Sequence, residues 1–207
     1  MTALHCDILV VGAGPAGSCA AAAAAEQGAR TLLIDAKTRI GEQHLCGEFV
    51  PPQLFTELNL SRASVIQPVE RMETVIIESA TGPRGSIPLS REDSIFGFPG
   101  GSTGAEPARD PGPWVSTSHE SRSPGLLIDR VRFDRDLART AAAQGATVLS
   151  SARLVGRTRD SWIVRYRGRE LHVRATYVIA GDGPVSTVGS LLGLTRPETL
   201  RGVQVEV

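Results

Sequence analysis

Two apolar runs near the N-terminus are separated by a glycine-rich break and an alanine-rich stretch. Residues 7–11 and 30–35 are rich in aliphatic and β-branched side chains, as expected of buried parallel strands. Residues 18–27 contain no helix breaker, and Gly28 stands where a helix commonly ends. The pattern therefore predicts a strand, a glycine turn, a helix and a second strand, which ends in Asp35.

Further along the chain, apolar positions predict a second set of elements. In residues 131–144, Phe133, Leu137 and Ala141 fall on one face of a helix. The other predicted elements are a short helix at 53–58 that opens with Pro51 and Pro52, antiparallel strands at 73–78 and 85–89 joined by a turn at 80–84, a strand at 146–150, a β-meander with strands at 152–158, 161–167 and 170–174, a strand at 177–180 and a short helix at 186–192.

Residues 97–125 differ in composition from the rest of the chain. Gly, Pro and Ser make up more than half of this stretch, and apolar positions do not recur in it. A long segment of this kind is uncommon inside a compact domain. We therefore expect a flexible insertion at 97–125, within an antiparallel excursion that spans residues 65–125.

The overall composition excludes several classes of protein. The chain has 207 residues, of which 41% are apolar, so it can bury a core. Its 22 basic and 22 acidic residues cancel, which argues against nucleic acid as a partner. Cys6, Cys19 and Cys46 form no CxxC pair, so neither a disulfide framework nor a zinc site is expected. Reduced thiols fit a cytoplasmic protein best.

The uncharged stretch 8–25 is long enough to be mistaken for a membrane span. Its first half contains three glycines and Pro15, which would leave backbone groups unpaired in a bilayer. No Lys or Arg precedes the stretch, so the charged start of a signal peptide is missing. We therefore predict no transmembrane segment here.

The glycine turn has the spacing that dinucleotide binding requires. Gly12 permits a tight turn, Gly14 lets the backbone approach a pyrophosphate, and Gly17 lets the helix lie close to the sheet. The helix N-terminus directs N–H groups at the phosphates. Asp35 can accept hydrogen bonds from ribose hydroxyls, and its charge disfavours a 2′-phosphate, so FAD or NAD is predicted rather than NADP. The alternative is a purely structural glycine turn.

Three further positions admit more than one interpretation. Cys46 lies in a loop after the second strand, where it is either a small buried residue or a neighbour of the cofactor. His44 is interpreted as a loop residue rather than a catalytic base. Asp182 follows a strand, and ligands of open α/β folds bind at the carboxyl edge of the sheet. An Asp-Gly pair is also common in ordinary turns.

Together, these segments resemble the flavoprotein monooxygenase superfamily that includes para-hydroxybenzoate hydroxylase and the geranylgeranyl reductases. Residues 7–35 look like the FAD fingerprint of that family. Residues 127–146 are similar to its R-x-x-F-D-x-x-L helix segment, and residues 178–188 are similar to its A-D-G-x-x-S-x-V motif. Residues 46–51 resemble the C-G-E-F-L-S-P loop of the geranylgeranyl-reductase-like members. One departure is Gly189, where the family usually has an arginine.

The resemblance implies an α/β fold, in which a Rossmann-like FAD/NAD(P)-binding domain carries a β-meander and part of an antiparallel substrate sheet. Residues 1–207 would form one discontinuous FAD-binding domain, with residues 65–125 as the partial substrate sheet. The family's C-terminal substrate domain would follow Val207. The implied cofactor-binding residues are Gly12, Gly14, Pro15, Ala16, Gly17, Asp35, Ala36, Cys46, Gly47, Arg130, Gly181 and Asp182.

The resemblance also implies an FAD-dependent oxidoreductase. NAD(P)H would reduce the flavin, and the enzyme would then hydroxylate or reduce a small hydrophobic substrate of isoprenoid, polyketide or aromatic type. The alternative is a truncated, catalytically inert nucleotide-binding module. An NAD-dependent dehydrogenase ranks below both, because it leaves the Gly-Asp-Gly segment unexplained. No catalytic residue or oligomeric state is predicted.

Overall fold

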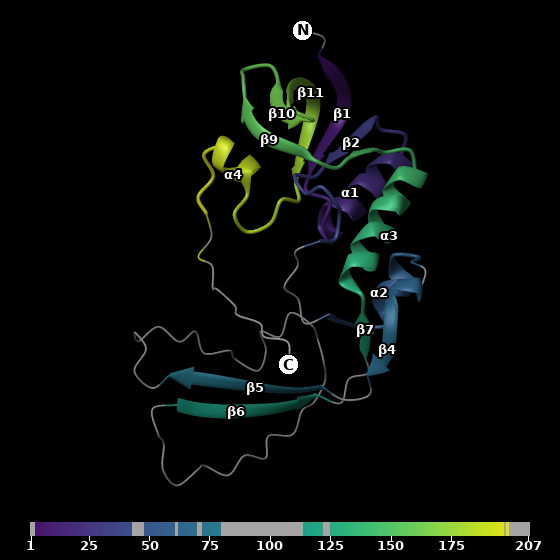
Figure 1. Ribbon diagram of the computed structural model, residues 1–207, viewed down its shortest axis with the longest axis vertical. Coiled ribbons are helices and arrows are strands. Elements are labelled where there is room, and N and C mark those ends of the chain that lie inside the picture. Colours follow the sequence, from purple (N-terminus) through teal and green to yellow (C-terminus); the bar gives the residue numbers. More distant parts are fainter. Residues whose placement is uncertain are drawn as a thin grey trace.

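A six-stranded mixed sheet forms the centre of the protein. The computed structural model describes residues 3–42, 48–60, 62–69, 72–79, 114–121, 125–196 and 198. The strand order is β8-β2-β1-β11-β10-β9 (Figure 1). Its strands are β1 (Leu4–Val11), β2 (Thr31–Ile34), β8 (Thr147–Leu149), β9 (Ala152–Arg157), β10 (Trp162–Tyr166) and β11 (Arg169–Ala180). Strands β8, β2, β1 and β11 run parallel, as the apolar runs predicted.

Strand β11 takes part in both halves of the sheet. Its first residues pair antiparallel with β10, from Arg169 to Val173, and residues as far as Ala180 pair parallel with β1. The prediction of separate strands at 170–174 and 177–180 was therefore wrong. The polar residues at this point, Arg174 at the end of the first predicted strand and Thr176 after it, occupy exposed positions of one continuous strand and need no break.

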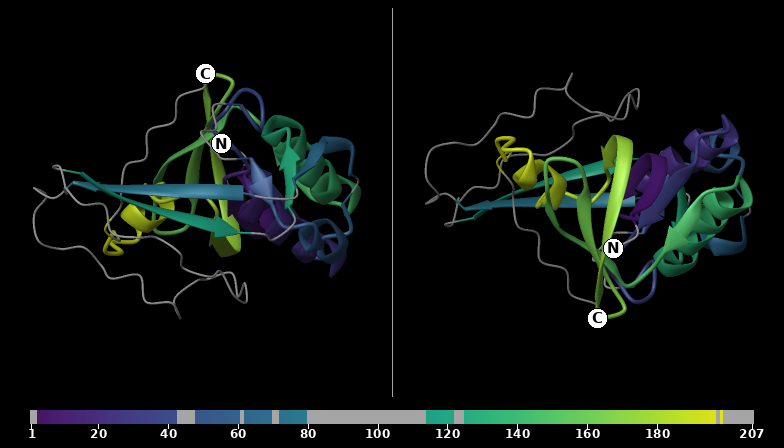
Figure 2. Two further views of the ribbon diagram at one scale, coloured as in Figure 1. Left: turned by 90° about the horizontal axis from the view of Figure 1, so that it is seen from below. Right: turned by 90° about the horizontal axis from the view of Figure 1, so that it is seen from above.

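The sheet is covered on both faces. Helices α1 (Pro15–Glu26) and α3 (Arg130–Ala143) lie side by side on one face (Figure 2). On that face, buried Val10 and Leu33 pack with alanines of the two helices. On the other face, Leu9 and Ile34 pack against apolar residues of the β9–β10–β11 meander. Burial on both faces explains why the strands are continuously apolar, since each fully buried Leu or Val contributes about 1.5–3 kcal/mol.

A second, smaller layer packs against the first half of α3. It consists of a three-stranded sheet, β3-β7-β4, and a short helix, with Phe55 and Phe133 in edge-to-face contact at 5.8 Å between ring centroids. Asp129 ends this layer and begins α3, because its side chain accepts a hydrogen bond from the Arg132 N–H at 3.0 Å. The elements are β3 (Phe49–Val50), α2 (Gln53–Glu57), η1 (Arg62–Ser64), β4 (Val65–Val69) and β7 (Gly125–Ile128).

Two further strands, β5 (Met72–Ser79) and β6 (Trp114–Ser121), form an antiparallel pair. The sequence predicted β5, with a strand at 85–89 as its partner across a turn at 80–84. Residues 80–89 lie outside the described residues, so that pairing stays a prediction. The expected flexible insertion at 97–125 is corrected at residues 114–121, which form the strand β6.

The last described element is the short helix α4 (Thr187–Leu191). It follows β11, and its Val188 is buried in the core that β1 and β2 form with the meander strands β9, β10 and β11. Within the described part of the chain, no helix has the length and apolar character needed to cross a membrane.

Candidate functional site

The carboxyl ends of three parallel strands meet at one edge of the sheet. Val11 pairs with Ile34 of β2 on one side and with Ala180 of β11 on the other. The residues that follow these three strands are the predicted site residues Gly12, Asp35 and Gly181. The topology therefore brings three separate sequence motifs to one place.

The glycine turn after β1 is tightly built. Gly12 has φ +98°, and its N–H donates to the Ile34 carbonyl at 2.8 Å. Gly14 precedes α1, and Pro15 is the first residue of the helix. A Cβ added to Gly14 would meet no atom within 4 Å, so its backbone borders open space. No side chain caps the start of α1, which leaves its first N–H groups available to a ligand.

Three glycines stand in direct backbone contact. A Cβ on Gly17 would lie 1.8 Å from the Gly12 carbonyl oxygen, and one on Gly12 would lie 2.3 Å from the Gly181 carbonyl oxygen. A Cβ on Gly181 would lie 2.9 Å from the Gly17 Cα. Gly181, which the sequence nominated only as a cofactor contact, is thus also the residue that lets β11 approach the glycine turn.

Asp35 ties the glycine turn to the end of β2. Its side chain is only 8% exposed. One carboxylate oxygen, Oδ2, accepts the Ala13 N–H at 2.7 Å, and the other, Oδ1, accepts the Lys37 N–H at 2.7 Å. These bonds hold the carboxylate in place before any ligand arrives, while each oxygen keeps a second lone pair for a ribose hydroxyl. Ala36, another predicted contact, is exposed beside it.

Asp182 shapes the loop between β11 and α4. Its Oδ1 accepts the Ser186 hydroxyl at 2.6 Å, and its Oδ2 accepts the N–H groups of Thr187 at 2.7 Å and Val188 at 3.1 Å. Ser186 in turn caps α4 by accepting the Gly189 N–H at 2.9 Å. Asp182, which was predicted to lie near the pyrophosphate, therefore makes these hydrogen bonds within its own loop and the start of α4.

Arg130, the first residue of α3, is anchored by a residue that the sequence analysis did not single out. Its Nε donates to Oδ1 of the fully buried Asp134 at 2.7 Å. The spacing of four residues within R-x-x-F-D places the two side chains on one helix face, which is the signal that could have found Asp134. A buried carboxylate needs such a partner, and the pair fixes the direction of the Arg130 side chain.

The described cysteines have no nucleophilic character. Burial raises the pKa of the Cys6 thiol to about 11 and also raises that of Cys19, so both remain protonated at neutral pH. Cys46, Gly47 and His44 lie outside the described residues.

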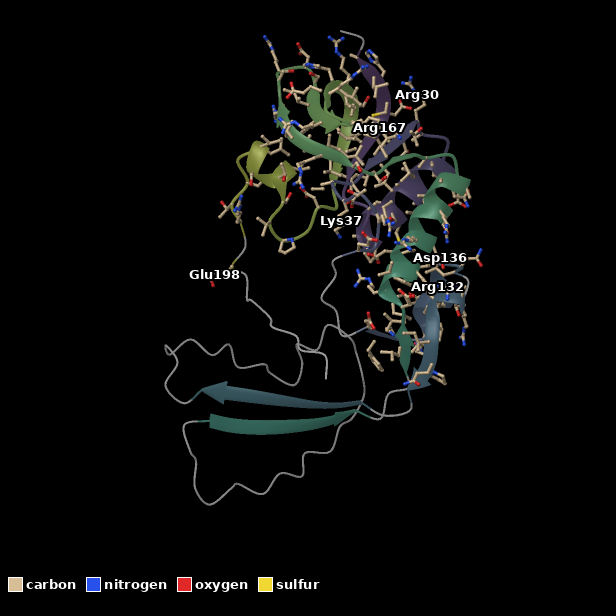
Figure 3. The ribbon with its side chains drawn as sticks, viewed as in Figure 1. Arg30, Lys37, Arg132, Asp136, Arg167 and Glu198 are labelled. Carbon is tan, nitrogen blue, oxygen red and sulfur yellow. The ribbon has the colours of Figure 1, made fainter. Side chains whose placement is uncertain are left out.

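The start of β2, at the other end of that strand from Asp35, serves as a contrast to the site. Here Asp7 binds Arg30, with 2.6 Å between Oδ1 and Nη2, and the guanidinium holds the pKa of Asp7 at about 2. Figure 3 shows Arg30 at the opposite end of the sheet from Lys37, which follows the ribose-acceptor candidate Asp35.

Comparison with known sequences decides the family. Residues 97–207 match the profile described as FAD binding domain, and residues 7–52 match that described as FAD dependent oxidoreductase. The chain belongs to the FAD-binding oxidoreductases. The profile described as FAD dependent oxidoreductase covers the glycine turn, and the profile described as FAD binding domain covers the Gly-Asp-Gly segment.

The similar curated proteins are reductases of isoprenoid lipids by name. Digeranylgeranylglycerophospholipid reductase of Methanocaldococcus jannaschii is 31% identical over 91% of this chain and 40% of its own length. Reductase 1 of that name from Methanothermobacter thermautotrophicus is 31% identical over 94% of this chain and 44% of its own length. The chain thus spans about two fifths of these relatives.

Solved structures agree on the fold. A geranylgeranyl bacteriochlorophyll reductase-like protein from Thermoplasma acidophilum superposes with a TM-score of 0.66, at 26% identity, over 93% of this chain and 43% of that one. The flavin-dependent monooxygenase PieE, solved with FAD and substrate, gives a TM-score of 0.59 at 19% identity, over 92% of this chain and 32% of that one. The predicted Rossmann-like α/β fold and the predicted family are therefore confirmed.

Proposed function

We propose that this chain holds FAD along the carboxyl edge of the sheet, with the glycine turn at the pyrophosphate and Asp35 at the adenosine ribose. The observation that carries the proposal is the meeting of Gly12, Asp35 and Gly181 at one edge, beside open space at Gly14. Backbone N–H groups of α1 suit a pyrophosphate, and a fixed carboxylate suits ribose hydroxyls.

The other predicted contacts complete the proposed site. Pro15 and Ala16 form the first turn of α1 at the pyrophosphate, and Arg130 reaches the cofactor from the start of α3. Gly181 and Asp182 form the neighbouring wall. Cys46 and Gly47 are proposed as neighbours of the isoalloxazine on the family resemblance alone.

When bound, FAD supplies the redox chemistry, accepting electrons from NAD(P)H and passing them on to a small hydrophobic substrate. We propose reduction of an isoprenoid double bond as the reaction, because the similar curated proteins at 31% identity are named reductases of isoprenoid lipids. Hydroxylation of a polyketide or aromatic substrate with molecular oxygen is the second candidate, favoured by the fold shared with PieE. A cytoplasmic location is part of the proposal.

The competing proposal is a nucleotide-binding module without turnover, and it is favoured by the fact that the chain spans only about two fifths of its relatives. A visible spectrum of the purified chain and identification of the released flavin test binding. Oxidation of NADH or NADPH by the same sample tests turnover. A yellow protein that releases FAD but oxidises neither nucleotide would favour the module, and a colourless protein that binds NAD would refute the proposed FAD binding.

A matched pair of variants tests the position of the pyrophosphate. Gly14 has φ −76°, which any residue can adopt, so Gly14→Ala leaves the fold intact but directs a methyl group into the open space. We expect FAD binding to weaken about tenfold or more, equivalent to about 1.4 kcal/mol. Gly156→Ala in β9, where the added Cβ makes only ordinary contacts, is the control. Equal affinities in the two variants would contradict the placement.

A further inference from the structure

The loop that leaves Asp35 is fastened to α3 by an arginine that neither the motifs nor the family resemblance singled out. We propose that Arg135 is a positioning residue of the FAD site, which holds residues Arg39–Glu42 in the conformation that FAD binding requires. The inference rests on the proposed FAD binding. It concerns the stretch of chain that joins the ribose acceptor Asp35 to Cys46 and Gly47, the proposed neighbours of the isoalloxazine.

The Arg135 side chain contacts both the backbone and a side chain of this loop. Its Nε donates to the Ile40 carbonyl at 3.1 Å, a contact between residues 95 positions apart. Its Nη2 lies 3.6 Å from Oε1 of Glu42, and the same oxygen accepts from Nη1 of Arg39 at 3.2 Å. The guanidinium therefore bridges two points of the loop, and the planar fork of an arginine suits this geometry.

The loop itself lies directly on the helix. Gly41 has φ +86°, and a Cβ there would lie 2.5 Å from the Val131 carbonyl oxygen in the first turn of α3. At its other end, the Lys37 carbonyl accepts the Ser151 N–H at 2.8 Å. The segment from Asp35 to Glu42 is therefore pinned to the sheet at one end and to α3 at the other. At the α3 end, Arg135 supplies the side-chain contacts that hold the loop.

This fastening has a consequence for ligand binding. A loop that must be ordered when the cofactor binds reduces affinity by the entropy that it loses, whereas a loop ordered beforehand does not. Because the segment starts at the ribose acceptor Asp35, its order fixes the chain beside that acceptor before FAD binds. Loss of Arg135 should therefore weaken FAD binding without unfolding α3.

Arg139 provides a matched control on the same helix. It lines the same hollow of about 450 Å³ between the loop, α3 and β8. Its ion pair stays within the helix, with 2.8 Å between Nη1 and Oδ1 of Asp136, and its side chain is 76% exposed. Figure 3 shows Asp136 on α3. The change Arg139→Met therefore removes the same charge from the same surface and leaves the bond to the loop in place.

The test measures FAD affinity of the apoprotein by quenching of flavin fluorescence. We expect Arg135→Met to weaken binding about tenfold and Arg139→Met to change it less than about twofold, with thermal midpoints of the two apoproteins alike. Equal affinities in the two variants would overturn the positioning role. Failure of the wild-type chain to bind FAD would instead refute the proposed function, so the two failures are distinguishable.

A double-mutant cycle separates positioning from general stability. Glu42→Gln removes the negative charge that faces Arg135, and we expect it to weaken FAD binding less than Arg135→Met does. If Arg135 acts through this loop, the effects of the two changes on FAD affinity will not add. Additive effects would overturn the proposal. If Arg135→Met does not fold, the same cycle can be measured with Arg135→Lys.

Discussion

Two carboxylates at the same edge of the sheet are used in opposite ways. Asp35 accepts N–H groups from Ala13 and Lys37, and the first of these bonds joins residues 22 positions apart. Among the described residues, Asp182 bonds only to Ser186, Thr187 and Val188, which follow within six positions. Asp35 thus fixes the glycine turn against β2, whereas Asp182 fixes only the loop that it belongs to. Changes at Asp35 should spread to the glycine turn, and changes at Asp182 should stay local.

The backbone contacts among Gly12, Gly17 and Gly181 join the strand ends that carry both carboxylates. Their loss should therefore have the largest effect. In Gly17→Ala the new methyl group would lie 1.8 Å from the Gly12 carbonyl oxygen, and backbone must move to relieve the clash. We expect the free energy of unfolding, measured in urea, to fall by about 3 kcal/mol or more. Gly156→Ala serves as the control, and a similar urea midpoint in both variants would contradict the geometry.

Asp35→Ala should have the next largest effect and should reveal the bridging role. It leaves the buried Ala13 N–H and the partly buried Lys37 N–H without their acceptor, so we expect a loss of about 2 kcal/mol of stability. Hydrogen exchange should accelerate at Ala13, across the sheet edge, and FAD binding should weaken together with it. Faster exchange confined to Lys37 would show that the glycine turn holds itself, and would remove the distinction between the two carboxylates.

Asp182→Ala should cost less and should leave the glycine turn unchanged. The loss of its three hydrogen bonds frees the start of α4, and for a partly exposed cap we expect about 1 kcal/mol. Exchange should accelerate at Thr187 and Val188 and stay at the wild-type rate at Ala13. An accelerated Ala13 amide in this variant would mean that β11 and the glycine turn are ordered as one unit.

The same difference between local and distant contacts explains what the sequence could predict. The strand, turn and helix over residues 7–27 follow from spacings within one segment, and so does the short helix at 186–192. The pairing of β5 with β6 joins strands that a long stretch of chain separates, and local turn signals do not reach that far. The bond between Arg135 and Ile40 joins residues 95 positions apart, and no spacing rule connects them. The ion pair of Arg130 with Asp134 could have been predicted from their spacing of four residues, but it was not among the predicted contacts.

Asp7 in β1 is a third carboxylate, paired with Arg30 where β2 begins, at the other end of that strand from Asp35. Asp7→Asn should have the smallest effect. The Arg30 hydrogen bonds hold the folded-state pKa of Asp7 at about 2, below its ordinary value of 3.8. The carboxylate therefore stabilises the fold above about pH 4, and this contribution disappears as the pH falls towards 2.

Thermal midpoints of Asp7→Asn and the wild type, measured from pH 7 down to pH 2, should accordingly differ slightly at pH 7 and converge between pH 4 and pH 2. FAD affinity at pH 7 should be the same in both proteins, because the pair lies at the opposite end of β2 from Asp35. A gap in midpoint that persists at pH 2 would show that the Asp7 side chain acts through packing. A weakened affinity would show that the two ends of β2 are coupled, and that an effect of Asp35→Ala on FAD cannot be ascribed to the site edge alone.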